Sequence, residues 1–228
     1  MRALRQFGRD LRSLLELALG SRFVLYAVVD LILLGGGLLD SLAGGGEPSS
    51  IYVSVVVLPL LLLGVPAQAD LVALERRAGS LDLALAIPDP QRYFIRRTGA
   101  VGLVLALQSA LSLAAIWAAE AMQFPILPAL LQALALAVLL SAVALFWALK
   151  VASPGGVWFA SLVSILALFP WTLANPIPAR GSEASHPFVG SLAATLPALG
   201  NALVVAIAAT LFYLYARRRL AHPERMLA

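Results

Sequence analysis

Residues 126–149 read ILPALLQALALAVLLSAVALFWAL, a run without a single charged side chain. An α-helix rises about 1.5 Å per residue, so about 20 apolar residues cross the roughly 30 Å hydrocarbon core of a bilayer. This run is long enough and apolar enough to do so. It therefore predicts a membrane-spanning helix.

Five further apolar runs have similar length. They cover residues 23–43, 51–69, 99–119, 157–175 and 195–216. Prolines interrupt the last two, and a re-entrant or short external helix around 183–196 is expected there, because non-helical backbone at membrane depth needs protein or water to satisfy it. We predict an all-α polytopic membrane protein with about six transmembrane helices, forming a single domain over residues 1–228.

The composition excludes an ordinary soluble protein. The 228 residues are 61% hydrophobic and 12% charged, with a mean hydropathy of +0.91, whereas soluble domains are about 45–50% apolar and about 25% charged. So few charges cannot cover a water-exposed surface. The chain has no cysteine, which excludes a disulfide framework, a thiolate nucleophile and a sulfur-ligated metal.

Residues 1–20 have an amphipathic pattern rather than that of a cleaved signal peptide. The apolar side chains that recur at helical spacing are Leu4, Phe7, Leu11, Leu14, Leu15 and Ala18, and the charged ones on the other face are Arg5, Arg9, Arg12 and Glu16. This predicts an interfacial helix whose arginines reach the lipid headgroups. An ordinary basic flank of the first span is the alternative.

The basic residues predict the orientation. Of the 16 Lys+Arg, all but Arg180 lie in residues 2–22, 76–97, 150 and 217–225. By the positive-inside rule, both termini, the 70–98 loop and the 150–156 turn are cytoplasmic, and residues 44–50, 120–125 and 176–194 are external. We predict a multi-pass protein of the cytoplasmic (inner) membrane. The net charge of +4 then reflects topology, and no nucleic-acid partner is expected.

Few side chains could carry chemistry. His186 falls in a predicted external loop and His222 in the C-terminal tail, and carboxylates do not cluster within the spans. We therefore expect neither a metal site nor a catalytic Ser-His pair. The only lysine is Lys150, so the phosphate loop G-x-x-x-x-G-K-[ST] is absent. We expect no enzyme activity in this chain and no cofactor bound by it.

Asp30 is the one acid well inside a predicted span. An ionised side chain at that depth costs several kcal/mol unless it is paired or hydrated, so it is a candidate functional residue. Proton or cation coupling is one interpretation. The other is that Asp30 faces a polar cavity or a subunit interface near the headgroups, or is protonated. The glycines that follow, Gly35-Gly36-Gly37, allow either a close helix approach or loose packing.

The loop between the second and third spans contains a short apolar helix. Residues 81–87 are apolar apart from Asp82, charged residues flank them, and Pro88 and Pro90 end the segment. Such a helix in the cytoplasm must be buried against something. A groove on a soluble partner is the natural candidate, and a self-packed loop is the alternative.

This loop resembles the coupling-helix loop of type-2 ATP-binding cassette (ABC) transporter permeases. The matching residues are Glu75, Gly79-Ser80-Leu81, Leu85, Pro88, Tyr93 and Arg97, the last at a position where the family usually has lysine. The amphipathic start, the span count, the cytoplasmic termini and the broken region before the last span are also similar to that family. The resemblance thus covers nearly the whole chain.

The resemblance implies a permease subunit, expected to be an exporter, that works as a dimer with a second copy or a paralogue. Separate ATPase subunits would hold ATP and Mg and dock under residues 72–90. Contact with the ATPase is then expected at Glu75, Gly79, Ser80, Leu81 and Leu85. Gly79 would permit close approach, Leu81 and Leu85 would fill a groove, and Glu75 would meet a basic residue of the ATPase.

Three alternatives stay open. A haem-exporter-type subunit of cytochrome c maturation has a similar length and span count. An ATP-independent secondary transporter would use Asp30 as its coupling acid, although the two halves of the chain show no convincing internal repeat. A membrane scaffold would only anchor another protein. Besides protein partners, membrane lipid is expected to contact every span.

Overall fold

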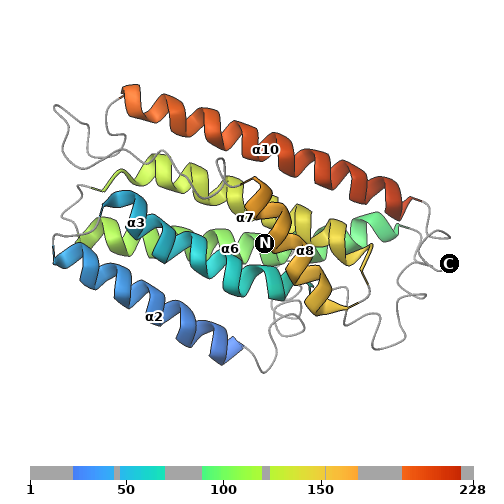
Figure 1. Ribbon diagram of the computed structural model, residues 1–228, viewed down its shortest axis with the longest axis horizontal. Coiled ribbons are helices and arrows are strands. Elements are labelled where there is room, and N and C mark those ends of the chain that lie inside the picture. Colours follow the sequence, from blue (N-terminus) through green and yellow to red (C-terminus); the bar gives the residue numbers. More distant parts are fainter. Residues whose placement is uncertain are drawn as a thin grey trace, which may run out of the picture.

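The protein folds as a bundle of long helices (Figure 1). The computed structural model describes residues 23–43, 47–69, 89–119, 124–151, 153–168 and 192–221. Helices make up 92% of these residues, and no strand occurs among them. The all-helical prediction is therefore confirmed.

Four helices are long and apolar enough to cross a membrane. They cover Ser49–Ala69, Pro90–Ala119, Ile126–Ala148 and Leu196–Leu220. This confirms the prediction of a transmembrane, multi-pass protein. The total of about six spans stays a prediction, and the interfacial helix over 1–20 lies outside the described residues.

The helix bounds differ in places from the predicted spans. In chain order the described helices are α2 (Phe23–Leu42), α3 (Pro48–Tyr52), η2 (Val53–Val57), η3 (Leu60–Gly64), α6 (Pro90–Ala119), α7 (Ile126–Ala148), α8 (Pro154–Ala167) and α10 (Leu192–Leu220). The short helix α8 covers only the first part of the predicted span 157–175, because residues 169–191 lie outside the described part of the chain.

The segments α3, η2 and η3 form one continuous helical rod over residues 48–69, in which η2 and η3 are π-helical. Two prolines, Pro59 and Pro66, lie within this rod. Proline has no backbone N–H and cannot complete the regular α-helical ladder, so it favours local departures from α geometry. We call residues 48–69 the second rod.

Helix α6 begins at Pro90, nine residues before the predicted span 99–119. Asp89 starts it, because its Oδ1 accepts a hydrogen bond from the Arg92 backbone N–H at 2.9 Å, and proline suits the first helical position. The hydropathy criterion detects only the part of a helix that lies in hydrocarbon. Residues 90–98, predicted to be loop, form the first turns of this helix. The Asp89 cap starts the helix, and its arginines suit the polar headgroup region.

Helix α7 is the centre of the bundle. It packs against α6, α8 and α10, while α2 packs on α6 and on the second rod. The main core is aliphatic and links the second rod, α6, α7 and α10, with Leu113, Leu139 and Leu140 fully buried. Large apolar side chains such as Leu31, Leu111 and Leu211 are exposed on the outside, as expected for a surface that faces lipid.

The glycine run of α2 has one packed member. A Cβ on Gly37 would overlap Cγ2 of Val55 in the second rod, whereas a Cβ on Gly35 or Gly36 would meet nothing within 4 Å. Close helix approach is therefore the role of Gly37. The other two glycines lie against open space.

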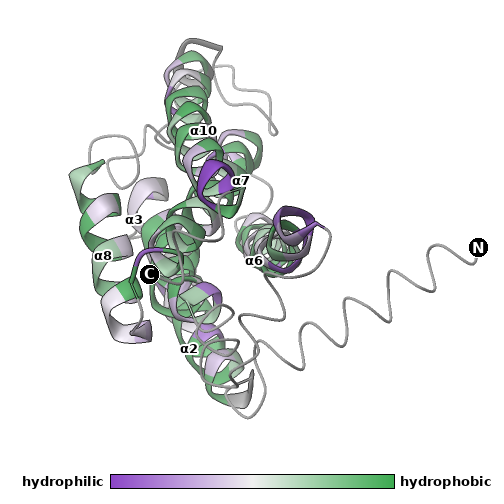
Figure 2. Cartoon of the chain, turned by 90° about the vertical axis from the view of Figure 1, so that its right-hand side faces the viewer, coloured by the Kyte–Doolittle hydropathy of each residue, from purple (hydrophilic) through white to green (hydrophobic). Residues whose placement is uncertain are grey.

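One end of the bundle collects basic side chains. The start of α6 and the ends of α7 and α10 lie together there (Figure 1), and Figure 2, viewed from that end, shows hydrophilic colour on the nearest helix ends. We call this the basic end. Its described cations are Arg92, Arg96, Arg97, Lys150, Arg217, Arg218 and Arg219.

Lys150 sits among aromatic rings at the basic end. Its Nζ lies 4.3 Å from the ring centroid of Phe146, 5.1 Å from that of Tyr215 and 5.4 Å from that of Trp147. Cations over aromatic faces are stabilised by about 0.5–2 kcal/mol. A lysine with surrounding Trp and Tyr is typical of a membrane–water interface, so the basic end matches the level of the headgroups.

Candidate functional site

Asp30 has a polar partner inside the bundle. It is half-buried on α2, and its Oδ1 accepts a hydrogen bond from Gln108 Nε2 of α6. The two residues are 78 positions apart in sequence. The bond joins a helix on the outside of the bundle to one that contributes to its core.

The pair lies far from both helix ends. Asp30 precedes the end of α2 at Leu42 by twelve residues, and Gln108 precedes the end of α6 at Ala119 by eleven. At 1.5 Å per residue these separations are about 18 Å and about 17 Å. Gln108 therefore lies well inside a helix that is long and apolar enough to cross a membrane, and the hydrogen bond places Asp30 beside it.

Asp30 is the one described acidic residue that lies away from a helix end. Within the described residues, the remaining acids Asp40, Glu47 and Asp89 lie at or near helix ends. A carboxylate next to a carboxamide can bind a proton or one small cation and release it again. An intramembrane acid with a hydrogen-bonding partner is a common component of such relays.

Other buried polar side chains join helices without carrying charge. Asn201 Nδ2 of α10 donates to Gln132 Oε1 of α7 at 2.8 Å, and Gln132 Nε2 donates to the Ala198 carbonyl at 2.7 Å. Gln68 Nε2 of the second rod donates to the Thr98 carbonyl and to Ser141 Oγ. Such bonds hold membrane helices together.

Ser161 and Ser164 are the two serines inside helix α8. Ser164 Oγ donates to the Ala160 carbonyl at 2.8 Å and accepts from Trp147 Nε1 at 2.9 Å. Ser161 is fully buried, and its hydroxyl has no hydrogen-bond partner among the described residues. Helix packing therefore accounts for Ser164.

The structure describes only part of the predicted site. Asp30 is described, and its partner Gln108 escaped sequence reasoning although a glutamine inside an apolar run is a visible signal. The predicted ATPase contacts Glu75, Gly79, Ser80, Leu81 and Leu85 lie outside the described residues, as does Pro88.

Two residues of the loop motif do fall in the described part. Arg97 Nη1 donates to Tyr93 OH at 2.6 Å, and the guanidinium carbon lies 5.2 Å from the Tyr93 ring centroid. Both are on the first turns of α6, and Arg97 is buried. They therefore stabilise the start of the helix that follows the predicted coupling loop.

Fold and site together define a polytopic helical membrane protein with an acid–amide pair between two of its described helices. Comparison with models of protein families finds no match, and no curated protein or solved structure matches the chain. The functional argument therefore rests on the residues themselves.

Proposed function

We propose that this chain is the membrane-spanning permease subunit of an ATP-driven ABC transporter. It would work as a dimer, with a second copy or a paralogue, and with separate ATPase subunits that hold ATP and Mg. Export is the proposed direction. The sequence of residues 75–97, which resembles a coupling loop, is the starting point, and the packing at the basic end supports it.

The observation that carries the proposal is a packed cluster at the basic end. Ala69, the last described residue before the loop, and Phe94, near the start of α6, belong to the same buried cluster. The other members are Leu145, Ala148, Leu149, Val157, Ala216 and Leu220. The helical segments on both sides of residues 70–88 thus contribute to one buried group of side chains.

This attachment suits a loop that transmits force. The cluster includes residues of the second rod, α6, α7, α8 and α10, so a displacement of the loop would act on several helices together. Packed cores respond by discrete rearrangement rather than by gradual deformation. A docked ATPase pair that moves residues 75–85 would therefore tilt the bundle as a unit.

Co-purification tests the proposal directly. The chain would be purified in mild detergent from its native membrane, and mass spectrometry and an ATPase assay would identify what it carries. We expect a nucleotide-binding subunit with the wild type, and its loss with Leu81→Asp/Leu85→Asp, because one face of the short helix fills the groove.

Leu83→Asp/Ile87→Asp is the matched control, because it places two charges at the same spacing on the opposite face of that helix. The control should keep the ATPase. A wild-type chain that carries no ATPase, or equal loss in both variants, would contradict the proposal.

The acid–amide pair favours a second candidate, a secondary transporter that uses Asp30 as its coupling acid. The observation behind it is the Asp30–Gln108 hydrogen bond between α2 and α6. Asp30→Asn keeps an acceptor for Gln108 but removes the charge. Lost transport with intact assembly would support this candidate, and unchanged transport would exclude it.

The proposal also assigns the basic end to the cytoplasm of the cytoplasmic membrane. The chain has no cysteine, so single cysteines introduced at exposed positions can report topology. Glu47 lies before α3 and Ala221 follows α10. We expect a membrane-impermeant thiol reagent to label Glu47→Cys in intact cells, and Ala221→Cys only after permeabilisation. The reverse pattern would invert the orientation.

A further inference from the structure

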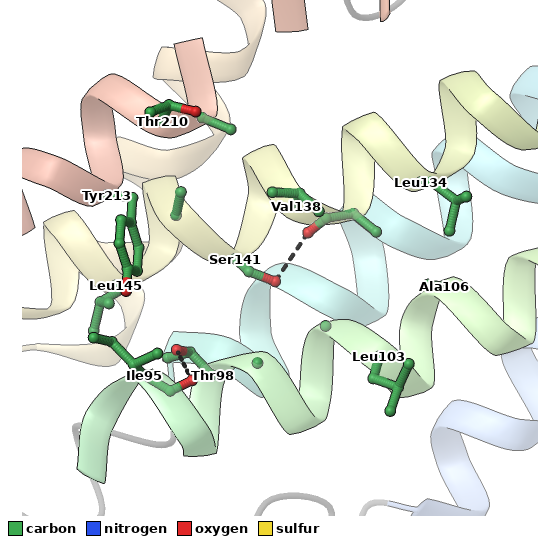
Figure 3. Close-up of a pocket in the computed structure, with 15 residues that line it drawn as sticks. Ile95, Thr98, Leu103, Ala106, Leu134, Val138, Ser141, Leu145, Thr210 and Tyr213 are labelled. Atoms are coloured by element: carbon green, nitrogen blue, oxygen red, sulfur yellow. Dashed lines mark hydrogen bonds between the residues drawn. The ribbon is translucent and has the colours of Figure 1, made fainter. Parts of the chain in front are cut away.

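A lateral cleft lies between α6 and α10, with α7 as its floor (Figure 3). Its volume is about 530 Å³, within the roughly 300–1,000 Å³ of small-molecule sites. Ile95 and Ala106 mark its two ends on α6, and Ala209 and Tyr213 line it from α10. Figure 3 shows Tyr213 reaching from α10 toward Ile95.

The serine and threonine hydroxyl groups around the cleft bond to their own helices. Thr98 Oγ1 donates to the Phe94 carbonyl at 2.9 Å, Ser141 Oγ to the Ala137 carbonyl at 2.9 Å, and Thr210 Oγ1 to the Ala206 carbonyl at 2.8 Å. Each donor is thus already satisfied within its helix. The cleft therefore offers its occupant an apolar surface, which suits a hydrocarbon chain better than a polar solute.

The length of the cleft matches one leaflet. Ile95 and Ala106 are eleven residues apart on α6, which corresponds to about 17 Å along the helix axis. Half of the roughly 30 Å hydrocarbon core is about 15 Å. An occupant that enters from the basic end would reach the middle of the bilayer.

A second, basic pocket lies about one helical turn beyond the cleft, toward the basic end. It measures about 340 Å³ and is lined by Gln91, Leu214, Arg217, Arg218 and Ala221. Gln91 lies one helical turn before Ile95, and Arg217 one turn after Tyr213. Arg217 Nε donates to Gln91 Oε1 at 3.2 Å, so this contact joins α6 to α10 at the basic pocket.

The charge of this pocket is positive. Arg217 and Arg218 are exposed, and the partner of Arg217 at this contact is a neutral amide. The described acid nearest to Gln91 in sequence is Asp89, just before α6, and its carboxylate accepts a hydrogen bond from the Arg92 backbone N–H. Basic pockets between helices at the membrane surface attract anionic headgroups.

We propose that the cleft and the basic pocket together bind one anionic phospholipid. An acyl chain lies between α6 and α10 over α7, and the headgroup phosphate contacts Arg217 and Arg218. This site is independent of the transport proposal and of the Asp30–Gln108 pair. It explains the apolar cleft and the basic pocket between α6 and α10, which neither the predicted coupling loop nor Asp30 accounts for.

A second copy of this chain fits the cleft less well. Gly99, Gly102 and Ala106 form a stripe of small residues, which by size would admit a helix. A copy inserted in the same orientation would, however, bring its own arginine-rich helix end against Arg217 and Arg218. Like charges at an interface are unfavourable, whereas an anionic lipid neutralises them.

Lipid titration of the purified full chain tests the site. The delipidated protein is titrated with dioleoylphosphatidylglycerol, dioleoylphosphatidylcholine or inorganic phosphate, and bound lipid is counted by native mass spectrometry. We expect tighter binding of the anionic lipid and no competition by phosphate. Arg217→Gln/Arg218→Gln should weaken binding of the anionic lipid about 30-fold, because each arginine contributes about fivefold.

Two control sets make the result specific. Arg92→Gln/Arg96→Gln removes the same charge from α6 outside the basic pocket, and should change affinity less than about threefold. Gly99→Leu fills the cleft where a Cβ meets nothing within 4 Å. It should weaken both lipids about tenfold, the equivalent of about two buried methylene groups. Gly36→Leu adds the same side chain to an open face of α2 and should have no effect.

Three outcomes would overturn the proposal. Equal affinity for the two lipids would show that the site does not recognise an anionic headgroup. Competition by inorganic phosphate would show that the arginines bind a free anion instead of a lipid headgroup. If Gly99→Leu leaves lipid binding unchanged but converts a dimer to a monomer, the cleft binds a helix of a second copy.

Discussion

Replacing Gln108 by leucine should destabilise the bundle through Asp30. Gln108 Nε2 is the donor to Asp30 Oδ1, and the variant would leave that half-buried carboxyl group without its donor. Hydrogen bonds to charged groups contribute about 1.5–3 kcal/mol, while polar contacts between membrane helices average about 0.6 and reach about 1.7 kcal/mol. We therefore expect Gln108→Leu to lower the free energy of unfolding by about 1–3 kcal/mol.

The double-mutant cycle isolates the pair. Asp30→Leu/Gln108→Leu replaces both polar groups by apolar ones, which is close to neutral when the packing is kept. The double variant should thus be more stable than the sum of the single effects by about 1–2 kcal/mol. Asp30→Asn should be mild, because an amide oxygen still accepts from Gln108.

The assay is unfolding by SDS titration in mild-detergent micelles, followed by helical circular dichroism. A second cycle, Asp30→Leu with Gln132→Leu, is the control, because Gln132 bonds to Asn201 and Ala198 whereas Asp30 bonds to Gln108. Those two effects should add within about 0.5 kcal/mol. If the Asp30–Gln108 cycle is also additive within that margin, the two side chains do not interact in the folded protein.

Two further predictions concern packing within the bundle. Gly37→Ala should destabilise the protein by about 1–3 kcal/mol, because its Cβ would overlap Val55. Gly36→Ala should be neutral or stabilising by up to about 1 kcal/mol, since alanine is the better helix former. Thermal melting compares the two variants, and equal melting temperatures would contradict the close contact at Gly37. Gln132→Leu should lower the free energy of unfolding by about 1–2 kcal/mol, because it removes the acceptor of Asn201. In the same SDS titration, Gln132→Leu/Asn201→Leu should recover most of that loss. A double variant whose loss equals the sum of the two single losses would refute the pairing.

The sequence was sufficient for the class of protein. Apolar runs such as 126–149 have one stable solution in a bilayer, because a helix satisfies its own backbone groups and hydrocarbon satisfies none. The same reasoning selected Asp30, since an acid within an apolar run is visible by inspection. Helix α6 begins before the predicted span 99–119, because hydropathy does not register helical turns outside the hydrocarbon, here residues 90–98.

Helix formation could be predicted from sequence because its hydrogen bonds are local, closing over four residues of the same segment. Side-chain pairing is not local. The partner of Asp30, the packed glycine among three consecutive ones, and the cleft between α6 and α10 depend on how each helix is rotated and which helices become neighbours. That arrangement is set by close packing across the whole bundle, and so only the tertiary structure decided it.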